Sequence, residues 1–379
     1  MTDSAGVPVV MNPSEGLWGP GEGWTLEEVL SIGALDGPPE LQFGQIVGVD
    51  LDEAGNLYAV DMQARVVRVF GPGGEPLRTV GSPGSGPGEL GLQVAGVYVS
   101  DSLVRVPDLQ NQRVTRYTLE GEAAPGIPLD LAAGIPLRWD ETADDALLVQ
   151  TRGIDAGDGS GPLPGDPVVV LDAAGEITDT VVLLPPGESF RMGAQGMQMR
   201  FFEPEPIWDA GSDGVLASGV NDGYRIELRD AGGELVRVVQ REAELRPVTE
   251  RDQEVFLDAI RDAASDAGAP PPAVEGFLRN ATFADTYPAF ASLLVGPDQT
   301  LWVQRIRTGD ELAGDDEGTF DPQDLGSTEW EVFDGEGQYL GVVTFPGRFQ
   351  PLKVEGDRFY GVARDELDVQ RLKGYRLVR

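Results

Sequence analysis

The sequence predicts an all-β fold, a β-propeller of six four-stranded antiparallel blades. The first observation is a unit of apolar run, acidic or glycine turn and second apolar run that recurs about every fifty residues. One copy spans Val47 to Val80 and reads as four strands joined by tight turns. One such sheet cannot bury both of its faces alone, but repetition around a ring covers them.

The second observation is a set of turns between the third and fourth strand of each unit. Aspartate and glycine at these places suit turns that need positive φ. Five such turns predict five complete blades: Gly71–Glu75, Leu119–Glu122, Asp172–Glu176, Asp230–Glu234 and Asp334–Gln338.

The third observation is a sixth unit that is divided between the two ends of the chain. The stretch from Pro351 to Arg379 supplies three strands, and Leu26–Ile32 supplies the fourth. Pairing of N- and C-terminal strands would close the propeller and cover the edges of an open sheet.

We therefore expect a single domain over residues 1–379 with a helical insertion between blades 4 and 5. The expected parts are an N-terminal extension at 1–23, a strand completing blade 6 at 24–33, blade 1 at 43–81, blade 2 at 90–128, blade 3 at 135–184, blade 4 at 205–241, the helical insertion at 242–288, blade 5 at 289–345 and the rest of blade 6 at 349–379.

The charge of the chain is strongly negative, with 28 basic against 64 acidic residues and a net charge of −36. Nucleic acid is excluded as a partner because its phosphates would be repelled. The acidic surface is typical of salt-adapted, halophilic proteins, and calcium loading is the alternative. Lys353 and Lys373 are the only lysines. No apolar run approaches the ~18 residues of a membrane-spanning helix.

Two residue types are missing, and each absence excludes a class of chemistry. The chain has no cysteine and no histidine. Disulfides, thiolate nucleophiles, Ser-His-Asp triads and His-ligated zinc are therefore excluded. An enzyme built on this chain must use carboxylates, Tyr, Ser, Thr or Arg.

Two segments resemble the NHL-repeat signature, which has Asp, then Asn, then Arg-Val and an aromatic residue. Asp108–Tyr117 matches it, and Asp61–Phe70 is a shorter version. The openings Asp3–Val7 and Trp18–Trp24 resemble those of a group of bacterial six-bladed propeller proteins. The resemblance implies an exported protein of the periplasm or cell surface, often a lipoprotein anchored through a removed N-terminal leader. The segment from Met1 to Pro20 is not itself a signal peptide.

Long insertions fall on one face of the predicted propeller, the face that carries the loops between second and third strands and the blade-to-blade connections. They are Gly153–Asp166, Pro185–Pro204, Glu242–Pro288 and Ile306–Thr328. Long loops tend to carry function, so we expect this face to be the working side.

The insertion Glu242–Pro288 contains the one convincing helix. Thr249 is its expected cap with Asp252 three residues on, and Gly268 ends it. Its apolar stripe would cover either the central channel, as a lid, or the rim of a blade.

Candidate ligand-binding residues lie at the loop-bearing rim. They are Arg152, Arg305, Arg364, Asp61, Asp108, Asn221 and Asp222. The three arginines would either clamp a carboxylate or phosphate or pair with neighbouring acids. For Asp61 and Asp108 the alternative is that each fixes its own loop, as the resemblance to the NHL repeat implies.

Metal candidates lie in the densest acidic loop, at Asp310, Asp315, Asp316 and Glu317. Oxygen-rich loops of this kind either bind calcium or remain solvated, and their spacing fits no EF-hand. No other cofactor is expected, and no catalytic residue is assigned.

The sequence favours a non-catalytic binding or scaffold propeller of the bacterial cell envelope that recognises a protein, peptide or glycan as a monomer. One alternative is a calcium-dependent lactonase or hydrolase that uses channel carboxylates. The other is a purely structural surface protein.

Overall fold

The structure of the chain is a computed structural model. It describes residues 2–4, 6–129, 134–142, 144–153, 165–187, 189–193, 196–242, 244–266, 268–309, 311, 325–365, 367 and 369–379. These residues form an all-β fold of six blades, each with four antiparallel strands at its centre, which confirms the fold class predicted from the repeats.

Contacts divide the chain into two compact units. Unit 1 consists of Met1–Gly23, Pro185–Asp209 and Val215–Thr344. Unit 2 consists of Trp24–Leu184, Ala210–Gly214 and Phe345–Arg379. Unit 2 holds blades 1, 2, 3 and 6, while blades 4 and 5 and both α-helices of the described residues belong to unit 1, apart from Ala210 at the end of blade 4's first strand.

The first two blades of unit 2 each run in chain order across their sheet. Blade 1 consists of β4 (Ile46–Leu51), β5 (Leu57–Asp61), β6 (Val66–Phe70) and β7 (Pro76–Val80). Blade 2 consists of β10 (Tyr98–Val99), β11 (Leu103–Asp108), β12 (Arg113–Thr118) and β13 (Ala123–Pro128). A short parallel pair, β8 (Ser82–Pro83) with β9 (Glu89–Leu90), lies between them in the chain.

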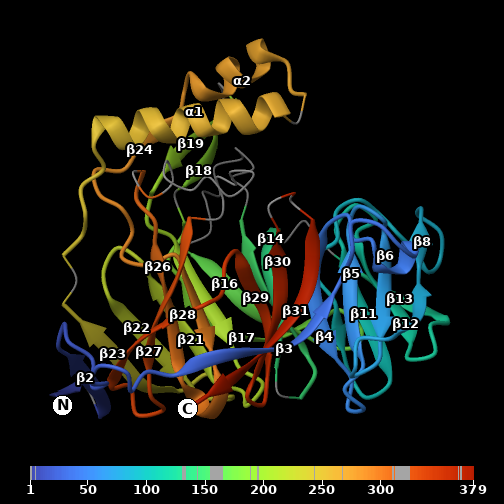
Figure 1. Cartoon of the computed structure of the whole chain (residues 1–379), viewed down its shortest axis with the longest axis horizontal. Coiled ribbons are helices and arrows are strands. Elements are labelled where there is room, and N and C mark those ends of the chain that lie inside the picture. The colour runs from blue at the N-terminus through green and yellow to red at the C-terminus, as the bar shows by residue number, and fades with distance from the viewer. Residues whose placement is uncertain are drawn as a thin grey trace. The chain divides into compact units, whose positions relative to one another are not determined.

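Blades 3 and 6 complete unit 2. Blade 3 consists of β14 (Ile135–Glu141), β15 (Leu147–Arg152), β16 (Asp166–Leu171) and β17 (Ile177–Leu184). Blade 6 consists of β29 (Phe349–Glu355), β30 (Arg358–Arg364), β31 (Gln370–Val378) and β3 (Thr25–Ile32). Figure 1 shows β3 in blue near β31 in red, and their antiparallel pairing confirms that the two ends of the chain share a blade.

The burial of each blade follows from the position of its strands. All five residues of β5 are buried because it lies between two other strands and both of its faces are covered. By contrast, the outermost strand β7 buries only Val80. Apolar side chains such as Tyr58, Val69, Val104 and Tyr117 join blades 1 and 2 in one core cluster.

The turns predicted from Asp and Gly have the expected backbone. In all five, the critical glycine has a φ between 78° and 97°, namely Gly74, Gly121, Gly175, Gly233 and Gly337. In three of them an aspartate side chain also accepts backbone N–H groups two and four residues on, namely Asp172, Asp230 and Asp334. Local chemistry therefore fixes these turns, as the sequence predicted.

Glycine has a different role where blades 1 and 2 meet. A Cβ added to Gly48 in β4 would lie 2.6 Å from Gly96 Cα. The two backbones can approach this closely only because Gly48 has no side chain. This contact brings the first strands of the two blades together.

Unit 1 contains blades 4 and 5. Blade 4 consists of β20 (Pro206–Ala210), β21 (Leu216–Val220), β22 (Arg225–Arg229) and β23 (Leu235–Arg241). Blade 5 consists of β25 (Ser292–Val295), β26 (Leu301–Ile306), β27 (Gly326–Phe333) and β28 (Tyr339–Thr344). A further small sheet contains β18 (Phe190–Gly193), β19 (Gly196–Phe201) and β24 (Thr282–Phe283).

The N-terminal extension is part of blade 4, which the sequence did not predict. Strand β2 (Val7–Asn12) pairs in parallel with β23, and β1 (Thr2–Ser4) pairs with β2, so this sheet has six strands. The Asn12 side chain is buried and bonds to blade 5, donating to the Gly337 carbonyl at 2.9 Å and accepting from Tyr339 N–H at 2.8 Å. The extension therefore joins blades 4 and 5.

The helical insertion holds α1 (Glu250–Asp266) and α2 (Pro271–Leu278), which confirms a helix between blades 4 and 5. The predicted cap is present, because Thr249 Oγ1 accepts from Asp252 N–H at 3.2 Å and Asp252 accepts from Thr249 N–H at 2.8 Å. Gly268 follows the helix with a φ of 73°. Within the described ranges, neither helix has the length and apolar character needed to span a bilayer.

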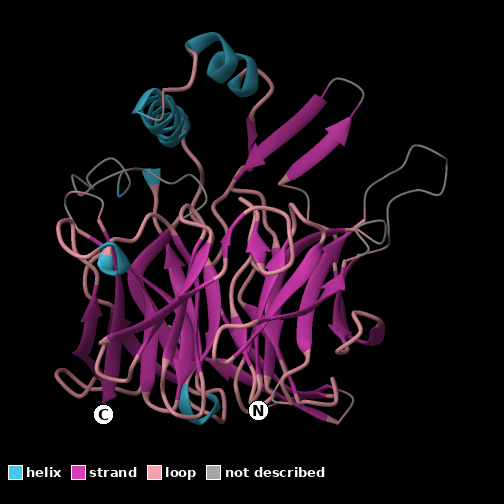
Figure 2. Ribbon diagram, turned by 90° about the vertical axis from the view of Figure 1, so that its right-hand side faces the viewer, coloured by secondary structure: helices cyan, strands magenta, loops and turns pink. Residues whose placement is uncertain are grey.

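Helix α1 buries its apolar stripe within unit 1. Phe256 is fully buried and makes edge-on ring contacts with Phe201 and Phe202, at centroid distances of 4.9 Å and 4.8 Å. Figure 1 shows both helices beyond the end of β26, and in Figure 2 they are the cyan coils at the top. The described packing of α1 is therefore with the small sheet and with Ile306 at the end of β26, within unit 1.

Candidate active site

Four side chains occupy comparable places near the ends of the first strands in unit 2. Asp50 lies opposite Tyr58, Tyr98 opposite Arg105, Asp140 opposite Leu148 and Lys353 opposite Tyr360. Strands β4, β10, β14 and β29 each form one edge of their blade, so these edges carry one layer of polar side chains. Contacts of β4 with β10 and with β29 bring three of these edges together.

Lys353 is the centre of this layer. Its ammonium nitrogen lies 2.8 Å from Asp50 Oδ1 and 2.6 Å from Glu141 Oε1. Asp50 uses its other oxygen, Oδ2, to accept from Val99 N–H at 2.6 Å. One lysine therefore links blades 6, 1 and 3, and Asp50 extends the link to blade 2.

Glu141 is held by two different cations. Its Oε1 bonds to Lys353, and its Oε2 lies 3.0 Å from Nη2 of Arg105 in blade 2. The other terminal nitrogen of Arg105, Nη1, donates to the carbonyl of Asp145. Each oxygen of the Glu141 carboxylate thus has its own positively charged donor.

Burial makes these charges interact strongly. The side-chain exposures are 2% for Asp50, 9% for Arg105, 13% for Glu141 and 21% for Lys353. Burial, reinforced by the negative charge of Asp50, raises the pKa of Glu141 to about 7 although Lys353 and Arg105 oppose the rise. Burial also raises the pKa of Asp50 above its ordinary value, against the opposing effect of Lys353.

Lys353 itself remains charged. Burial disfavours its ammonium form, but the neighbouring carboxylates Asp50 and Glu141 outweigh that effect and raise its pKa. The lysine is therefore a fixed positive charge and not a base. The pKa of Glu141, at about 7, allows its carboxyl group to exchange a proton near neutral pH.

Two further ionisable side chains, Asp140 and Tyr98, lie close to this cluster. Asp140 Oδ1 accepts from Glu141 N–H at 2.9 Å, and burial raises the pKa of Asp140 against the charges of Arg138 and Lys353. Burial and the charge of Asp140 raise the pKa of Tyr98 well above its ordinary range.

One hydrogen bond of the cluster recurs in unit 1, where it has a structural role. Asp209 Oδ2 in β20 accepts from Val295 N–H at 2.7 Å, as Asp50 does from Val99. Each of these two hydrogen bonds joins the first strand of one blade to the first strand of the following blade. Asp50 differs because Lys353 and Glu141 are added to it, so the lysine and the glutamate mark the candidate site.

The arrangement suits acid–base catalysis. A partly exposed carboxyl group with a pKa near 7 donates or accepts a proton efficiently at neutral pH. Two fixed cations stabilise the carboxylate that remains after the proton has left. The cluster lies near the C-terminal ends of the first strands β4, β14 and β29, next to the turns that lead to the second strands. The long loops that we expected to form the working side belong to the opposite ends of the strands.

Two of the three arginines predicted at the rim form ion pairs with acidic side chains. Arg152 lies 2.6 Å from Asp166 Oδ2, and Arg305 lies 2.5 Å from Glu329 Oε2 and 3.4 Å from Glu331 Oε1. Arg364 ends β30 and is partly exposed. Arg152 and Arg364 belong to unit 2 and Arg305 to unit 1. A ligand at Arg152 or Arg305 would have to displace these carboxylates.

The other predicted rim residues mostly bond to the backbone. Asp61 accepts from the N–H groups of Gly44, Gln45 and Ala64. Asp108 accepts from those of Gly91 and Asn111.

Two further rim candidates belong to blade 4. Asn221 accepts from Glu205 N–H and donates to the Phe290 carbonyl. Asp222 is exposed in the turn after β21.

The metal candidates Asp310, Asp315, Asp316 and Glu317 lie outside the described residues. Within the described part of the chain, no group of three or more Asp or Glu side chains could hold a metal ion. The unit 2 cluster does not fit calcium, because the Lys353 ammonium lies between the carboxylates that would have to bind the ion.

This cluster was not predicted from the sequence, although lysine is rare in the chain. Its members are far apart in the chain, and no local motif connects Asp50, Glu141 and Lys353. One feature of the sequence could have indicated the cluster. Lys353 stands in the first strand of blade 6 at the place where the first strands of blades 1, 3 and 4 have aspartate.

Comparisons with known proteins support the fold. No protein-family model matches the chain, and no curated protein matches it. A member of the DUF4221 family from Bacteroides vulgatus matches with a TM-score of 0.56 at 13% identity, covering 94% of this chain and 99% of that one. A Bacteroides fragilis protein that is thought to be exported matches with a TM-score of 0.54 at 11% identity, covering 98% of this chain and all of the other. The chain therefore has the fold of a six-bladed β-propeller.

The expectation of a non-catalytic binding or scaffold propeller is wrong in the light of these comparisons. The matching structures that are named for an activity include enzymes, such as virginiamycin B lyase from Staphylococcus aureus, with 13% identity, a TM-score of 0.44 and coverage of 94% of this chain and all of that one. A similarity of this degree carries no reaction over to this chain. The chemistry must come from the residues of the chain itself.

Proposed function

We propose that the chain is a hydrolase of the lactonase or esterase type whose acid–base group is Glu141 in unit 2. The observation that carries the proposal is a carboxyl group held between Lys353 and Arg105, with burial raising its pKa to about 7. Perturbed ionisable groups of this kind are concentrated at active sites.

Glu141 acts as a general acid in this proposal. A water molecule attacks the acyl carbon of an ester or lactone, and the carbon–oxygen bond to the leaving group breaks. The leaving oxygen takes the proton of Glu141, and the carboxylate that forms is stabilised by Lys353 and Arg105. The proton lost by the attacking water returns to Glu141, and the acid product ionises into solvent.

Each neighbour has a separate task. Asp50 holds the ammonium group of Lys353 at 2.8 Å, and the Asp145 carbonyl holds Arg105. The two cations therefore keep their places whether Glu141 is protonated or ionised. Calcium is not needed at this cluster, since Lys353 supplies the positive charge between the carboxylates.

The test is hydrolysis of a panel of lactones and aryl esters by wild type, E141Q and D209N, followed in a pH-stat. We expect kcat/KM to fall above pH 7 and E141Q to lose at least about a hundredfold. D209N is the matched control, since Asp209 makes the interblade bond without the lysine. Excess EGTA should leave the rate unchanged. Equal rates for E141Q and wild type, or no hydrolysis above buffer, would refute the proposal.

We also propose that the protein is exported and acts outside the cytoplasm, with NHL-like repeats in blades 1 and 2. The match to the Bacteroides fragilis protein and the NHL-like segments Asp61–Phe70 and Asp108–Tyr117 support this proposal. Fractionation of the native cells, with an antibody to the chain, would test it. Recovery in the cytoplasmic fraction alone would contradict export.

A further inference from the structure

The two cations that hold Glu141 do not bond to Glu141 alone. Lys353 has a second partner in Asp50, at 2.8 Å, and Arg105 has one in the Asp145 carbonyl. If the Glu141 side chain became neutral and turned aside, a lysine and an arginine would still face the vacated place.

The vacated place has the dimensions of a carboxylate, because a carboxylate occupies it now. The Glu141 group bridges the two cations, with Oε1 at 2.6 Å from Lys353 Nζ and Oε2 at 3.0 Å from Arg105 Nη2. A carboxylate of another molecule could make the same two charge-assisted bonds. Lys353, with 21% of its side chain exposed, can be reached from solvent.

The charge of the site also favours an anion when Glu141 is neutral. The ionisable groups that interact electrostatically with Glu141 are Asp50 of β4, Tyr98 of β10, Arg105 of β11, Asp140 of β14 and Lys353 of β29. Arg138 of β14 acts in turn on Asp140 and Tyr98. With Glu141 and Tyr98 protonated and the other groups ionised, this set of groups together with Arg138 carries three positive charges and two negative ones. The surplus lies at Lys353 and Arg105.

We propose that Lys353 and Arg105 form a receptor for a small carboxylate, which takes the place of the protonated Glu141 side chain. The inference rests on the proposed function, in which hydrolysis of an ester or lactone releases such an acid beside Glu141. The product carboxylate is then bound by the cations that hold Glu141 in the free protein. Small carboxylic acids therefore inhibit the enzyme as products, and do so best below neutral pH.

Acetate is the probe, and its binding to the full chain is measured by titration calorimetry at pH 5.5 and 8.5 with chloride as the control anion. In this proposal, acetate binds only to molecules in which Glu141 is protonated. The pKa of about 7 for Glu141 sets their fraction at each pH. Binding should be roughly thirtyfold weaker at pH 8.5 than at pH 5.5, since affinity scales with that fraction.

Three variants make the result specific. K353M should abolish acetate binding, whereas K373M, which changes the other lysine of the chain, should not affect it. E141A removes the internal competitor, so it should bind acetate equally well at both pH values. If E141A folds poorly, E141Q serves the same purpose, because its neutral amide competes weakly for the two cations. Circular dichroism checks the fold of each variant.

Equal acetate binding by wild type and K353M would overturn the inference, as would a pH dependence that persists in E141A and E141Q. No acetate binding at pH 5.5 would overturn it too. Hydrolysis that depends on Glu141 without acetate binding would leave the proposed function intact and remove only the receptor. Acetate binding without hydrolysis of any ester would leave the receptor intact and refute the proposed function.

Discussion

Lys353 and Asp50 occupy comparable positions in blades 6 and 1, and their side chains form an ion pair of 2.8 Å. Blades 3 and 4 have Asp140 and Asp209 at the corresponding place. A lysine in this layer converts a series of interblade hydrogen bonds into a charged cluster. The cluster adds an ionisable group, Glu141, that titrates near neutral pH.

Replacing Lys353 by methionine should destabilise unit 2 strongly. K353M keeps most of the side-chain volume but leaves Asp50 and Glu141 without their shared cation. Removing one partner of a buried ion pair costs about 3–5 kcal/mol. Urea unfolding would measure this cost.

The control for this variant is K373M. Lys373 pairs at 2.6 Å with Glu28, whose side chain is 45% exposed, so its loss should cost about 1 kcal/mol or less. Similar midpoints for the two variants would show that the Lys353 cluster contributes no special stability.

The stability of unit 2 should depend on the proton of Glu141. Its pKa is about 7 in the folded chain against an ordinary 4.5, so the folded state binds the proton more tightly than the unfolded state. The resulting stabilisation is complete below pH 4.5 and is lost as pH rises through about 7. The shift corresponds to about 3 kcal/mol as an upper value.

Unfolding of wild type and E141Q at a series of pH values tests this dependence. The difference in unfolding free energy between them should change between pH 4.5 and 7 and be constant above pH 8. A constant difference over the whole range would contradict a raised pKa for Glu141.

The blades could be predicted from the sequence because local chemistry determines them. The aspartate and glycine residues of turns such as Asp230–Glu234 act within five residues, and the apolar runs on either side form the strands. The α1 cap was predictable for the same reason, since Thr249 and Asp252 bond to each other.

The candidate site could not be predicted because its groups converge from distant parts of the chain. Glu141 and Lys353 are 212 residues apart in the sequence. Whether their side chains meet depends on the register of β14 and β29 and on how the blades pack. The parallel pairing of β2 with β23 was missed for a related reason, because an extended segment of six residues carries no signal for its partner strand.

Asn12 should be essential for the link between the N-terminal extension and blade 5. N12A leaves the Gly337 carbonyl and Tyr339 N–H without the side chain that bonds to both. An unpaired buried polar group costs about 1–3 kcal/mol, so N12A should lower stability by about 2 kcal/mol or more.

The neighbouring Met11 provides the control, because 51% of its surface is exposed and M11A removes no such bond. Hydrogen exchange at β2 and β28 would locate the effect. Faster exchange in N12A but not in M11A is expected, and equal exchange in both would show that the extension is held by its backbone pairing alone.

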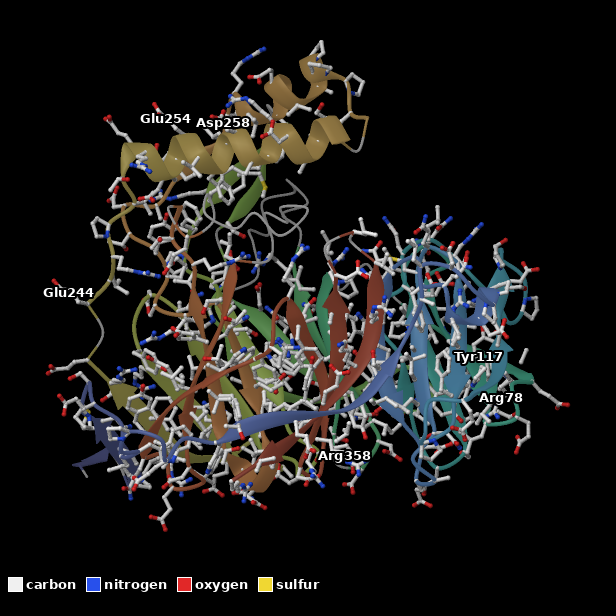
Figure 3. All side chains as sticks on the ribbon, in the orientation of Figure 1. Arg78, Tyr117, Glu244, Glu254, Asp258 and Arg358 are labelled. Carbon is white, nitrogen blue, oxygen red and sulfur yellow. The ribbon has the colours of Figure 1, made fainter. Side chains whose placement is uncertain are left out.

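Phe256 should hold α1 on unit 1. Its ring is fully buried against Phe201 and Phe202, whereas Glu254 and Asp258 lie on the outer side of the same helix (Figure 3). Replacing a buried phenylalanine by alanine costs about 3–5 kcal/mol, because apolar contacts are lost and a cavity remains. F256A should therefore release α1 from the aromatic cluster, while E254A should change stability by about 0.5 kcal/mol at most.

Hydrogen exchange separates release of the helix from unfolding of the blades. In F256A the amides of α1 should lose protection while those of β26 and β27 keep theirs, because the strands have their own core around Leu293, Val303 and Phe333. Hydrolysis by the unit 2 cluster should continue in the same variant, since α1 contributes no residue to it. Loss of protection in β26 together with α1 would show instead that the aromatic cluster is part of the core that folds blade 5.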